Sequence, residues 1–359
     1  MNVVIMDLYE LQPPALMQKL KASVDAELER FFDGVQPAWM GDICHHSVAS
    51  IREFTMRGGK RVRPILIVVG HDLFAPHDER VIKASISIEL TQSYLLIHDD
   101  IMDQSETRRG KPSLHAHFRT RFSELVPDPR RISENIAIVA GDLADAFAHR
   151  SLLESGLDPG ALLRANAELS RIIEYTGYGQ LIDINSAYED DFSQKDLLRL
   201  HLLKTAKYTI EGPLMIGSLL SRTDADLKPL SYYGMLLGTA FQLHDDILGL
   251  FGDEAETGKS IKSDVMEGKK TLLVLKALEL ADESDSRFII ENLGRQDITD
   301  ADFERFRGIV EKSGSLDYSK KMIEKLNAKC KEYLSAVRGN QGPKSFLKWF
   351  SDYIIQRKS

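Results

Sequence analysis

Residues 88–112, IELTQSYLLIHDDIMDQSETRRGKP, carry the pattern that predicts the fold class of this 359-residue chain. Apolar residues recur at helical spacing until the stretch reaches three carboxylates, Asp99, Asp100 and Asp103. Apolar residues elsewhere in the chain mainly follow the same spacing, and no series of short alternating runs predicts a sheet. We therefore expect an all-α protein.

Breaks between helices are predicted where Pro, Gly and Asp residues collect. They lie at residues 76–78, 126–129, 156–160 and 223–229. The apolar run Ile65–Val69 could be a buried strand by composition, but it follows Pro64, which is tolerated in a first helical turn, so we predict a core helix. No break is long or low in complexity, which favours a single large helical domain over residues 1–359. Within it we expect packing or dimer helices over residues 1–40, a motif-bearing core over residues 58–271 and C-terminal helices over residues 276–359.

The composition excludes several classes of protein. With 43% hydrophobic and 28% charged residues, the chain is globular rather than disordered. Its net charge of -8, from 46 Lys and Arg against 54 Asp and Glu, would repel nucleic acid. No apolar stretch is long enough for a membrane span, and Asp7 and Glu10 interrupt the start where a leader would be acid-poor. Cys44 and Cys330 cannot build a disulfide framework, so we expect a cytoplasmic protein.

The carboxylates of residues 88–112 suit a divalent cation. Asp99 and Asp103 are four residues apart, so their side chains share one helix face with Cβ atoms about 5 to 6 Å apart. Such closeness is unfavourable without a cation, and magnesium is usually held by one or two carboxylates together with substrate phosphates. Taken alone, the motif is equally typical of a solvated helix end.

A second acidic cluster makes the metal interpretation stronger. Residues 241–264, FQLHDDILGLFGDEAETGKSIKSD, place Asp245 and Asp246 late in another apolar helix. A histidine precedes each pair, His98 in the first cluster and His244 in the second, and we interpret both as packing residues or as residues that support the metal ligands, because magnesium prefers oxygen ligands. Charged groups after apolar runs belong at the mouth of an apolar cavity, since full burial would cost several kcal/mol per ion.

Basic residues form complementary clusters in residues 56–64, MRGGKRVRP, and 107–112, TRRGKP. Arginine binds phosphate with two hydrogen bonds, lysine adds a point charge, and glycine allows close backbone approach. The candidate anion-binding residues are Lys60, Arg61, Arg63, Arg108 and Arg109, with Lys204, Thr205, Lys259 and Lys269 further along the chain. An apolar cavity with two acidic clusters and several anion sites predicts a protein that binds diphosphates of isoprenoid alcohols.

These motifs resemble those of the trans-isoprenyl diphosphate synthases, or polyprenyl synthetases. The matching elements are GGKRVRP, DDIMD, RRGKP and FQLHDD, in the order of that family, and the match extends from Gly58 to Thr271. The resemblance implies an all-α isoprenoid synthase fold around a deep central cavity, usually in a homodimer. It also implies three magnesium ions per site, and isopentenyl and allylic diphosphates as substrates.

The resemblance assigns a role to each matching position. The metal-binding residues would be Asp99, Asp100, Asp103, Asp245 and Asp246, with Gln180 and Asp183 close to them. The catalytic residues would be Asp99, Asp103, Asp245, Lys204 and Thr205. The allylic diphosphate would be bound by Arg108, Lys204, Thr205, Gln242, Lys259 and Lys269. Isopentenyl diphosphate would be bound by Lys60, Arg63, Gln92 and Arg109. Independently of the family, Gln92 shares a helix face with Asp99, since seven residues leave an offset of about 20°.

The second acidic cluster departs from the family pattern at one position. Gly249 stands where the motif often ends in Asp, which puts the metal role of that position in doubt. Several short-chain members resemble this chain in having DDxxGxxGD, so we do not interpret the glycine as loss of activity. On a continuous helix Asp253 would lie about 12 Å from Asp245, too far to share its metal.

The resemblance also implies a reaction and a product. Magnesium would neutralise the leaving pyrophosphate, isopentenyl diphosphate would attack the allylic cation, and Thr205 with the carbonyl near Lys204 would stabilise that cation. In this family the product-length floor often lies four and five residues before the first Asp, here Leu95 and Tyr94. One aromatic residue there is similar to the archaeal geranylgeranyl synthases, so we predict a C20 product, with C15 as the alternative.

Three other functions compete with chain elongation. A class I terpene cyclase would need no isopentenyl diphosphate site. Here Lys60, Arg63 and Arg109 predict that such a site is present, which argues for chain elongation. A non-catalytic regulatory partner of a synthase would commonly have lost an acidic motif, and both remain here. An all-helical scaffold would not explain the alternation of acidic and basic clusters.

Overall fold

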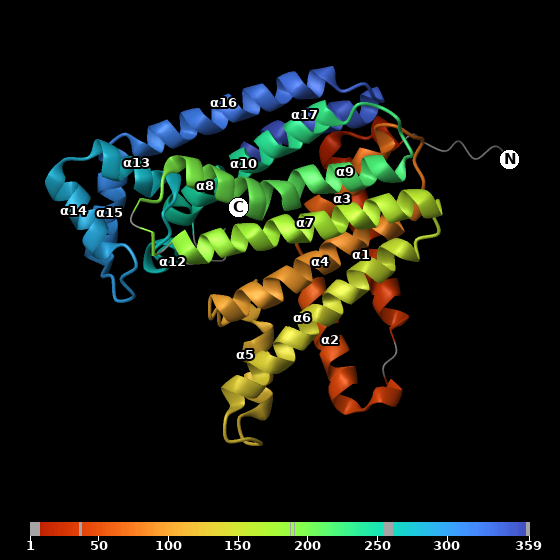
Figure 1. Ribbon diagram of the computed structural model, residues 1–359, viewed down its shortest axis with the longest axis horizontal. Helices are drawn as coiled ribbons and strands as arrows, with labels where there is room; N and C mark the ends of the chain where they lie inside the picture. The colour runs from red at the N-terminus through yellow and green to blue at the C-terminus, as the bar shows by residue number, and fades with distance from the viewer. Residues whose placement is uncertain (1–7, 36–37, 187, 190, 254–260, 357–359) are drawn as a thin grey trace. The chain divides into compact units, whose positions relative to one another are not determined.

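The computed structural model describes residues 8–35, 38–186, 188–189, 191–253 and 261–356. The all-α prediction is confirmed: within these residues the chain is helical apart from loops and one two-stranded hairpin (Figure 1). The first half contains η1 Leu8–Glu10, α1 Pro13–Asp33, η2 Ala38–Met40, α2 Asp42–Met56, α3 Val62–Asp72, α4 Arg80–Met102, β1 Thr107–Arg108, β2 Lys111–Pro112, α5 Leu114–Phe122, α6 Pro129–Leu153 and α7 Pro159–Ser186. The second half contains α8 Gln194–His201, η3 Leu202–Glu211, α9 Gly212–Leu220, α10 Lys228–Phe251, α12 Ser263–Met266, α13 Leu272–Leu280, α14 Glu283–Asn292, α15 Asp300–Lys312, α16 Ser315–Ala336 and α17 Gln341–Gln356.

The predicted breaks between helices are confirmed. Each of the four covers the connection before a helix, α4, α6, α7 or α10, and the last three also include the first one or two residues of that helix. Two of these helices begin with a proline, and at α6 the side chain of Asp128 also accepts a hydrogen bond from the backbone N–H of Arg131. The run Ile65–Val69 lies in α3 and is fully buried, as expected for a core helix.

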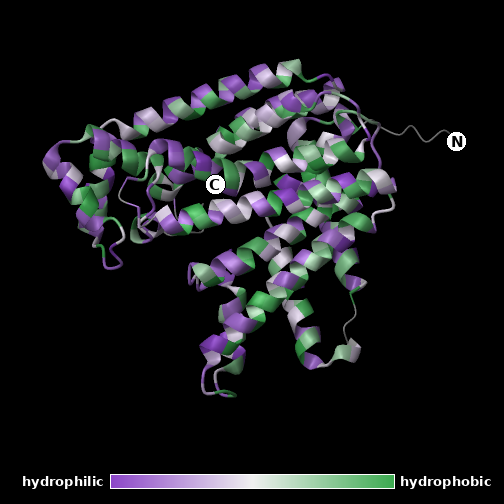
Figure 2. Ribbon diagram, viewed as in Figure 1, coloured by the Kyte–Doolittle hydropathy of each residue, from purple (hydrophilic) through white to green (hydrophobic). Residues whose placement is uncertain are grey.

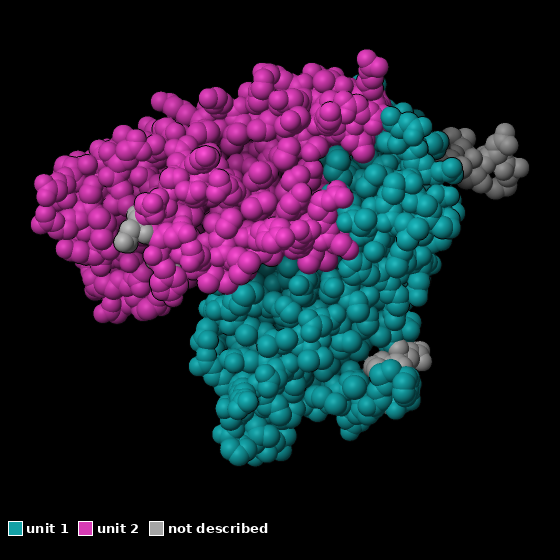
Figure 3. All heavy atoms as spheres, in the orientation of Figure 1, with its two compact units in different colours: residues 1–169, 213–224, 340–343 teal, residues 170–212, 225–339, 344–359 magenta. Residues whose placement is uncertain are grey.

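The chain divides into two compact units (Figure 3). Unit 1 comprises residues 1–169, 213–224 and 340–343, and unit 2 comprises residues 170–212, 225–339 and 344–359. The prediction of a single domain therefore stays a prediction, and each unit is described by itself.

Unit 1 is built around α4. Helices α1, α3 and α6 pack against it, and α5 packs against α6. Because α4 has neighbours on several sides, its residues from Val81 to Leu90 are almost all buried. The backbones of α3 and α9 lie in close contact at Gly70, because a Cβ on this residue would lie 3.0 Å from the Cα of Leu214.

Unit 2 is built around α10, which packs against α16 and against η3. Its residues Tyr233, Leu237 and Ala240 are fully buried, and the Tyr233 hydroxyl donates a hydrogen bond to the carbonyl of Leu347, 2.8 Å away. Hydrophilic and hydrophobic residues are interleaved along α16, as expected for a helix with one buried face (Figure 2). No helix in the described part of the chain has the length and hydropathy of a membrane span.

Candidate active site

The first acidic motif forms the last turn of α4 in unit 1. Asp99 and Asp103 lie one turn apart, and the backbone N–H of Asp103 donates to the carbonyl of Asp99 at 2.8 Å. Asp100 is fully buried, and its Oδ1 accepts two hydrogen bonds from the guanidinium of Arg108, with the Nε atom at 2.8 Å. Burial raises the pKa of Asp100, and Arg108 opposes this. Asp100 was predicted to bind metal and Arg108 to bind the allylic diphosphate. In the structure the two side chains also bind each other.

The predicted isopentenyl diphosphate residues gather in the same unit. The Nη1 atom of Arg63 donates to Oε1 of Gln92 at 3.1 Å, and the guanidinium of Arg109 donates to the carbonyl of Gly58. Burial lowers the pKa of Arg109, the charge of Glu89 opposes this, and the nearby guanidinium groups of Arg61, Arg63 and Arg108 lower the pKa further. A bound anion would relieve the repulsion among these guanidinium groups. Gln92, Arg108 and Arg109 line a cavity of about 10 Å³, roughly the room that one water needs.

Arg61, a candidate anion-binding residue from its place in the motif, has a different environment. Its side chain is 1% exposed and forms ion pairs with Asp25 of α1 and Glu89 of α4. The buried carboxylate of Glu89 and the partly exposed carboxylate of Asp25 satisfy the guanidinium, so Arg61 stabilises the packing of unit 1.

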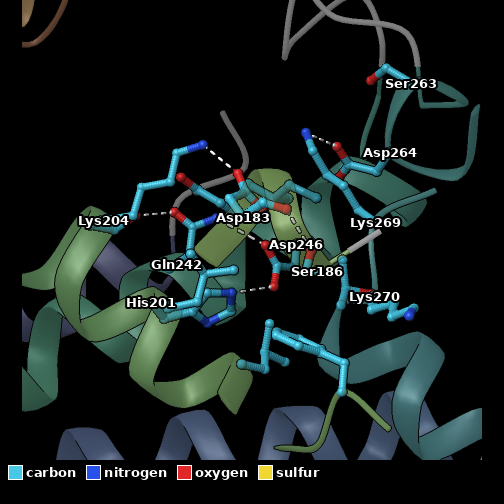
Figure 4. Close-up of a pocket in the computed structure, with 18 of the residues that line it drawn as sticks. Asp183, Ser186, His201, Lys204, Gln242, Asp246, Ser263, Asp264, Lys269 and Lys270 are labelled. Carbon is cyan, nitrogen blue, oxygen red and sulfur yellow. Dashed lines mark hydrogen bonds and ion pairs between the residues drawn. The ribbon is translucent and has the colours of Figure 1, made fainter. Parts of the chain in front are cut away.

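The second acidic motif lines a cavity of about 460 Å³ in unit 2 (Figure 4). The cavity wall combines side chains from α7, α8, η3, α10 and α12. The structure brings together seven residues that the sequence singled out, Asp183, Lys204, Thr205, Gln242, Asp245, Asp246 and Lys269.

Polar contacts connect three sides of this cavity. The Thr205 hydroxyl donates to Oε1 of Gln242 at 2.8 Å, and Nε2 of Gln242 donates to Oδ1 of Asp246 at 2.9 Å. Lys204, which precedes Thr205 on η3, forms an ion pair with Asp183 of α7, as Figure 4 shows. The arrangement holds one lysine, one hydroxyl and one carboxylate at fixed positions around the same cavity.

Lys204 and Thr205 lie on η3, a π-helix, a conformation that is often found at functional sites. Two glycines allow its backbone to approach its neighbours. A Cβ on Gly179 of α7 would lie 2.5 Å from the backbone N of Lys204, and a Cβ on Gly238 of α10 would lie 2.5 Å from the Cα of Ala206. The position of η3 therefore depends on the absence of side chains at both places.

The carboxylate of Asp246 is 8% exposed, and its Oδ2 atom makes no hydrogen bond, with Nε2 of His201 at 3.4 Å. Burial raises the pKa of Asp246 to about 7, the hydrogen bond from Gln242 opposes this, and the charges of Asp264 and Asp183 add to it. Burial lowers the pKa of His201 to about 4, so the imidazole is neutral at pH 7 and offers no compensating charge. The positive charge of Lys269 opposes the rise in the pKa of Asp246, but Lys269 itself forms ion pairs with Asp264 and Glu267.

The donor set fits magnesium. Asp245 and Asp246 supply carboxylate oxygens at the cavity wall, and the orphaned Oδ2 atom of Asp246 is a ligand atom without a partner. Across the described ranges, no three His, Cys, Asp or Glu side chains form a complete metal cage. Magnesium requires none, because it keeps several waters and takes further ligands from substrate phosphates.

Asp246→Asn is expected to stabilise the metal-free protein at pH 8. The carboxylate of Asp246 ionises at about pH 7 when folded but near 4 when unfolded, so its contribution to stability falls as the pH rises from 4 to 7. Asparagine keeps the oxygen that accepts from Gln242 and removes the charge. Urea unfolding in chelator should show a gain on the order of 2 to 4 kcal/mol at pH 8 and a smaller one at pH 5. An equal gain at both pH values would contradict the buried-charge explanation.

Gly249, which stands at the last position of the second acidic motif, lies against Asp264 of α12. A Cβ at Gly249 would overlap Oδ2 of Asp264, and Oδ1 of Asp264 accepts a hydrogen bond from Nζ of Lys269 at 2.9 Å. A carboxylate from α12 thus occupies the space beside the position where the family motif often has its third carboxylate.

Sequence reasoning did not single out Asp264 or His201, although both line the cavity. His201 lies three residues before Lys204, so helical spacing could have indicated a shared face. Asp264 lies fifteen residues after Gly249, and only the fold brings the two together.

Other predicted residues have separate surroundings. Tyr94 is half-buried in α4, and its ring packs edge-on against His98, with centroids 5.0 Å apart. His98 donates from Nε2 to the carbonyl of Ile138 on α6 at 2.9 Å. Helix α10 ends at Phe251, so the continuous helix assumed for Asp253 is wrong. Lys259 and residues 357–359 lie outside the described residues.

Comparisons with known proteins agree with these motifs. The family model described as polyprenyl synthetase matches residues 45–310. A geranylgeranyl diphosphate synthase of Saccharolobus solfataricus is 34% identical over 86% of this chain and 90% of that protein. A geranylfarnesyl diphosphate synthase of Aeropyrum pernix is 32% identical over 84% of this chain and 91% of its own. A crystal structure of geranylgeranyl pyrophosphate synthase from Corynebacterium glutamicum, complexed with isoprenyl diphosphate and magnesium, has a TM-score of 0.89 at 30% identity, covering 95% of this chain and 99% of its own.

Proposed function

Because this chain belongs to the polyprenyl synthetase family, we propose that it is a trans-prenyltransferase that joins isopentenyl diphosphate head-to-tail to C5, C10 and C15 allylic diphosphates and releases geranylgeranyl diphosphate, C20. The observation that carries the proposal is the cavity of unit 2, where Lys204, Thr205 and Lys269 line the same wall as Asp245 and Asp246. Cations, a hydroxyl and carboxylates around one cavity are what a magnesium diphosphate requires.

Magnesium, when bound, would neutralise the charge that develops on the leaving pyrophosphate. Each unit would supply its own carboxylates to magnesium, Asp99 and Asp103 in unit 1 and Asp245 and Asp246 in unit 2, and three ions per site stay a prediction. Lys204 and Lys269 would bind the allylic diphosphate. The Thr205 hydroxyl and the backbone carbonyl near Lys204 would stabilise the allylic cation through their dipoles. We keep Lys259 as a proposed ligand on the sequence motif alone.

The isopentenyl diphosphate site would use the basic residues of unit 1. Arg63 and Gln92 are already hydrogen bonded to each other, and Arg109 lies among other guanidinium groups whose repulsion a diphosphate would relieve. Lys60, in the same GGKRVRP segment, would add a further charge. This second substrate site favours chain elongation over cyclisation.

The first test is to incubate the purified protein with magnesium, labelled isopentenyl diphosphate and, separately, the C5, C10 and C15 allylic diphosphates. Mass spectrometry of the products should show C20 as the end product from each primer. A C15 or C25 end product would support the proposed trans-prenyltransferase activity but contradict the assigned C20 product length. Absence of condensation by folded protein would favour a regulatory partner of an active synthase instead.

Tyr94→Ala is expected to lengthen the product beyond C20, because removing the ring of a floor residue deepens the space for the growing chain. Leu95 would form the floor beside it. Product length is read from the same mass spectra, with Tyr178→Ala as the control, because the Tyr178 side chain is exposed and belongs to unit 2. An unchanged length in Tyr94→Ala would assign the floor to other residues.

A homodimer and a cytoplasmic location are proposed from the family resemblance. The exposed side chains of Ile138 and Val139, 42% and 57% accessible, make α6 a candidate surface for the second copy. Sedimentation at two protein concentrations tests the dimer.

A further inference from the structure

The turn that carries Arg108 and Arg109 needs support from outside itself. Strands β1 and β2 pair Arg108 with Lys111, which leaves Arg109 and Gly110 as a two-residue turn. Both turn residues have positive φ, 55° and 72°, as a type I′ turn requires. An isolated two-stranded hairpin is marginally stable in water, and a non-glycine residue at positive φ makes this one less stable.

Arg57, at the end of α2, supplies this support. Its Nη1 atom donates to the carbonyl of Pro112 at 2.8 Å and to that of Arg108 at 3.3 Å, one carbonyl on each strand. Its Nε and Nη2 atoms donate to Oε2 of Glu53 at 2.9 and 2.7 Å, and the guanidinium lies over the ring of Phe54. The side chain is only 4% exposed. These contacts use both edges of the guanidinium.

The carboxylate of Glu53 strengthens the same connection. Its second oxygen, Oε1, accepts a hydrogen bond from Nζ of Lys111 on β2 at 2.7 Å. Helix α2 is therefore joined to the hairpin at two backbone carbonyls and one side chain. Lysine at position 57 could not make this set of contacts, because it lacks the planar fork of arginine.

The two arginines of the turn depend on this connection to different degrees. The guanidinium of Arg108 has its own buried partner, Asp100. The guanidinium of Arg109 donates to the carbonyl of Gly58, the residue that follows Arg57, and lies against Gly59, where a Cβ would be 3.3 Å from its Nη2 atom. A change at Arg57 would therefore displace Arg109 more than Arg108.

We propose that Arg57 is a positioning residue for isopentenyl diphosphate: it holds the hairpin against the GGKRVRP segment so that Arg109 faces the diphosphate. This inference rests on the proposed function. Arg57 itself contacts protein atoms, so it acts through Arg109 and the Gly58–Lys60 backbone.

The test compares Arg57→Met with Arg57→Lys and with the control Arg52→Met. Arg52 lies five residues earlier on α2 and forms ion pairs with Glu29 and Asp33, away from the hairpin. Removing charge-assisted hydrogen bonds should raise the KM for isopentenyl diphosphate about tenfold in Arg57→Met and less in Arg57→Lys. The KM for the allylic substrate and the kcat should stay within about twofold in all three variants.

Equal rises in both KM values would indicate general loosening of unit 1 and overturn the proposal, as would an unchanged KM for isopentenyl diphosphate. Amide hydrogen exchange of residues 107–113 tests the positioning role without turnover: exchange should be faster in Arg57→Met than in the wild type and Arg52→Met. Unchanged exchange would overturn the positioning role even if the wild type proved inactive. An inactive wild type with faster exchange in Arg57→Met would refute the proposed function alone.

Discussion

Asp99→Ala is expected to lower kcat/KM by about 10³-fold or more at saturating magnesium, because several kcal/mol of electrostatic stabilisation of the leaving diphosphate depend on the carboxylates that hold the cation. Asp99 is placed for this role by its position in the last turn of α4, one turn before Asp103. Steady-state rates with labelled isopentenyl diphosphate and a C15 primer measure the loss. Binding of Mn²⁺ to the variant should weaken in parallel.

The matched control is Asp33→Ala, which removes an exposed carboxylate from the same unit. The Asp33 side chain is 66% exposed and pairs with Arg52. Its removal should leave the rate within about twofold, since exposed ion pairs contribute little. Near-normal turnover by Asp99→Ala would refute the assigned metal role of the first acidic motif.

Gly179→Ala is expected to lower kcat/KM by about 10²-fold, because displacements near 1 Å at a reacting centre can have effects of that size. The new Cβ would lie 2.5 Å from the backbone N of Lys204 and 2.7 Å from its Cα. Backbone atoms cannot rotate away as a side-chain end can, so η3 must shift, and Lys204 and Thr205 shift with it. Steady-state kinetics should show a higher KM for the allylic substrate together with a lower kcat.

Gly177→Ala is the control on the same helix. A Cβ at Gly177 meets no atom within 4 Å, and alanine favours a helix over glycine by up to about 1 kcal/mol. We expect unchanged kinetics and an equal or higher melting temperature for Gly177→Ala. If Gly179→Ala matched it in rate, the close approach of α7 and η3 would have no role in placing Lys204.

The helices could be predicted because their information is local. Apolar spacing and the positions of proline and glycine predicted the four breaks, and α3 was separable from a strand because Pro64 precedes its apolar run. The hairpin of residues 107–112 was not predicted. It has two residues per strand, too few for alternation to be visible, and its two-residue turn places Arg109 as well as Gly110 at a positive φ.

The residues of the candidate site could be predicted where they belong to a sequence motif. Lys204, Gln242 and Asp246 were identified from their segments, and the cavity of unit 2 brings them together. The partners of these residues were not predictable. Arg61 resembles Arg63 in sequence, yet only Arg61 is enclosed by Asp25 and Glu89. Distant residues compete for each charge, and sequence spacing does not reveal which one is close enough to bind it.

By itself the sequence determined that this protein is all-helical, that it carries two acidic and two basic motifs, and that these resemble the polyprenyl synthetases. These properties can be recognised from the sequence because hydrophobic periodicity and motif spacing involve residues that are close together along the chain. Only the tertiary structure decided that Asp264 fills the space beside Gly249, that Gly179 admits the backbone of Lys204, and that Arg57 supports the turn of Arg109. These contacts join residues that are 15 to 55 positions apart, and close packing of folded helices brings them within contact distance.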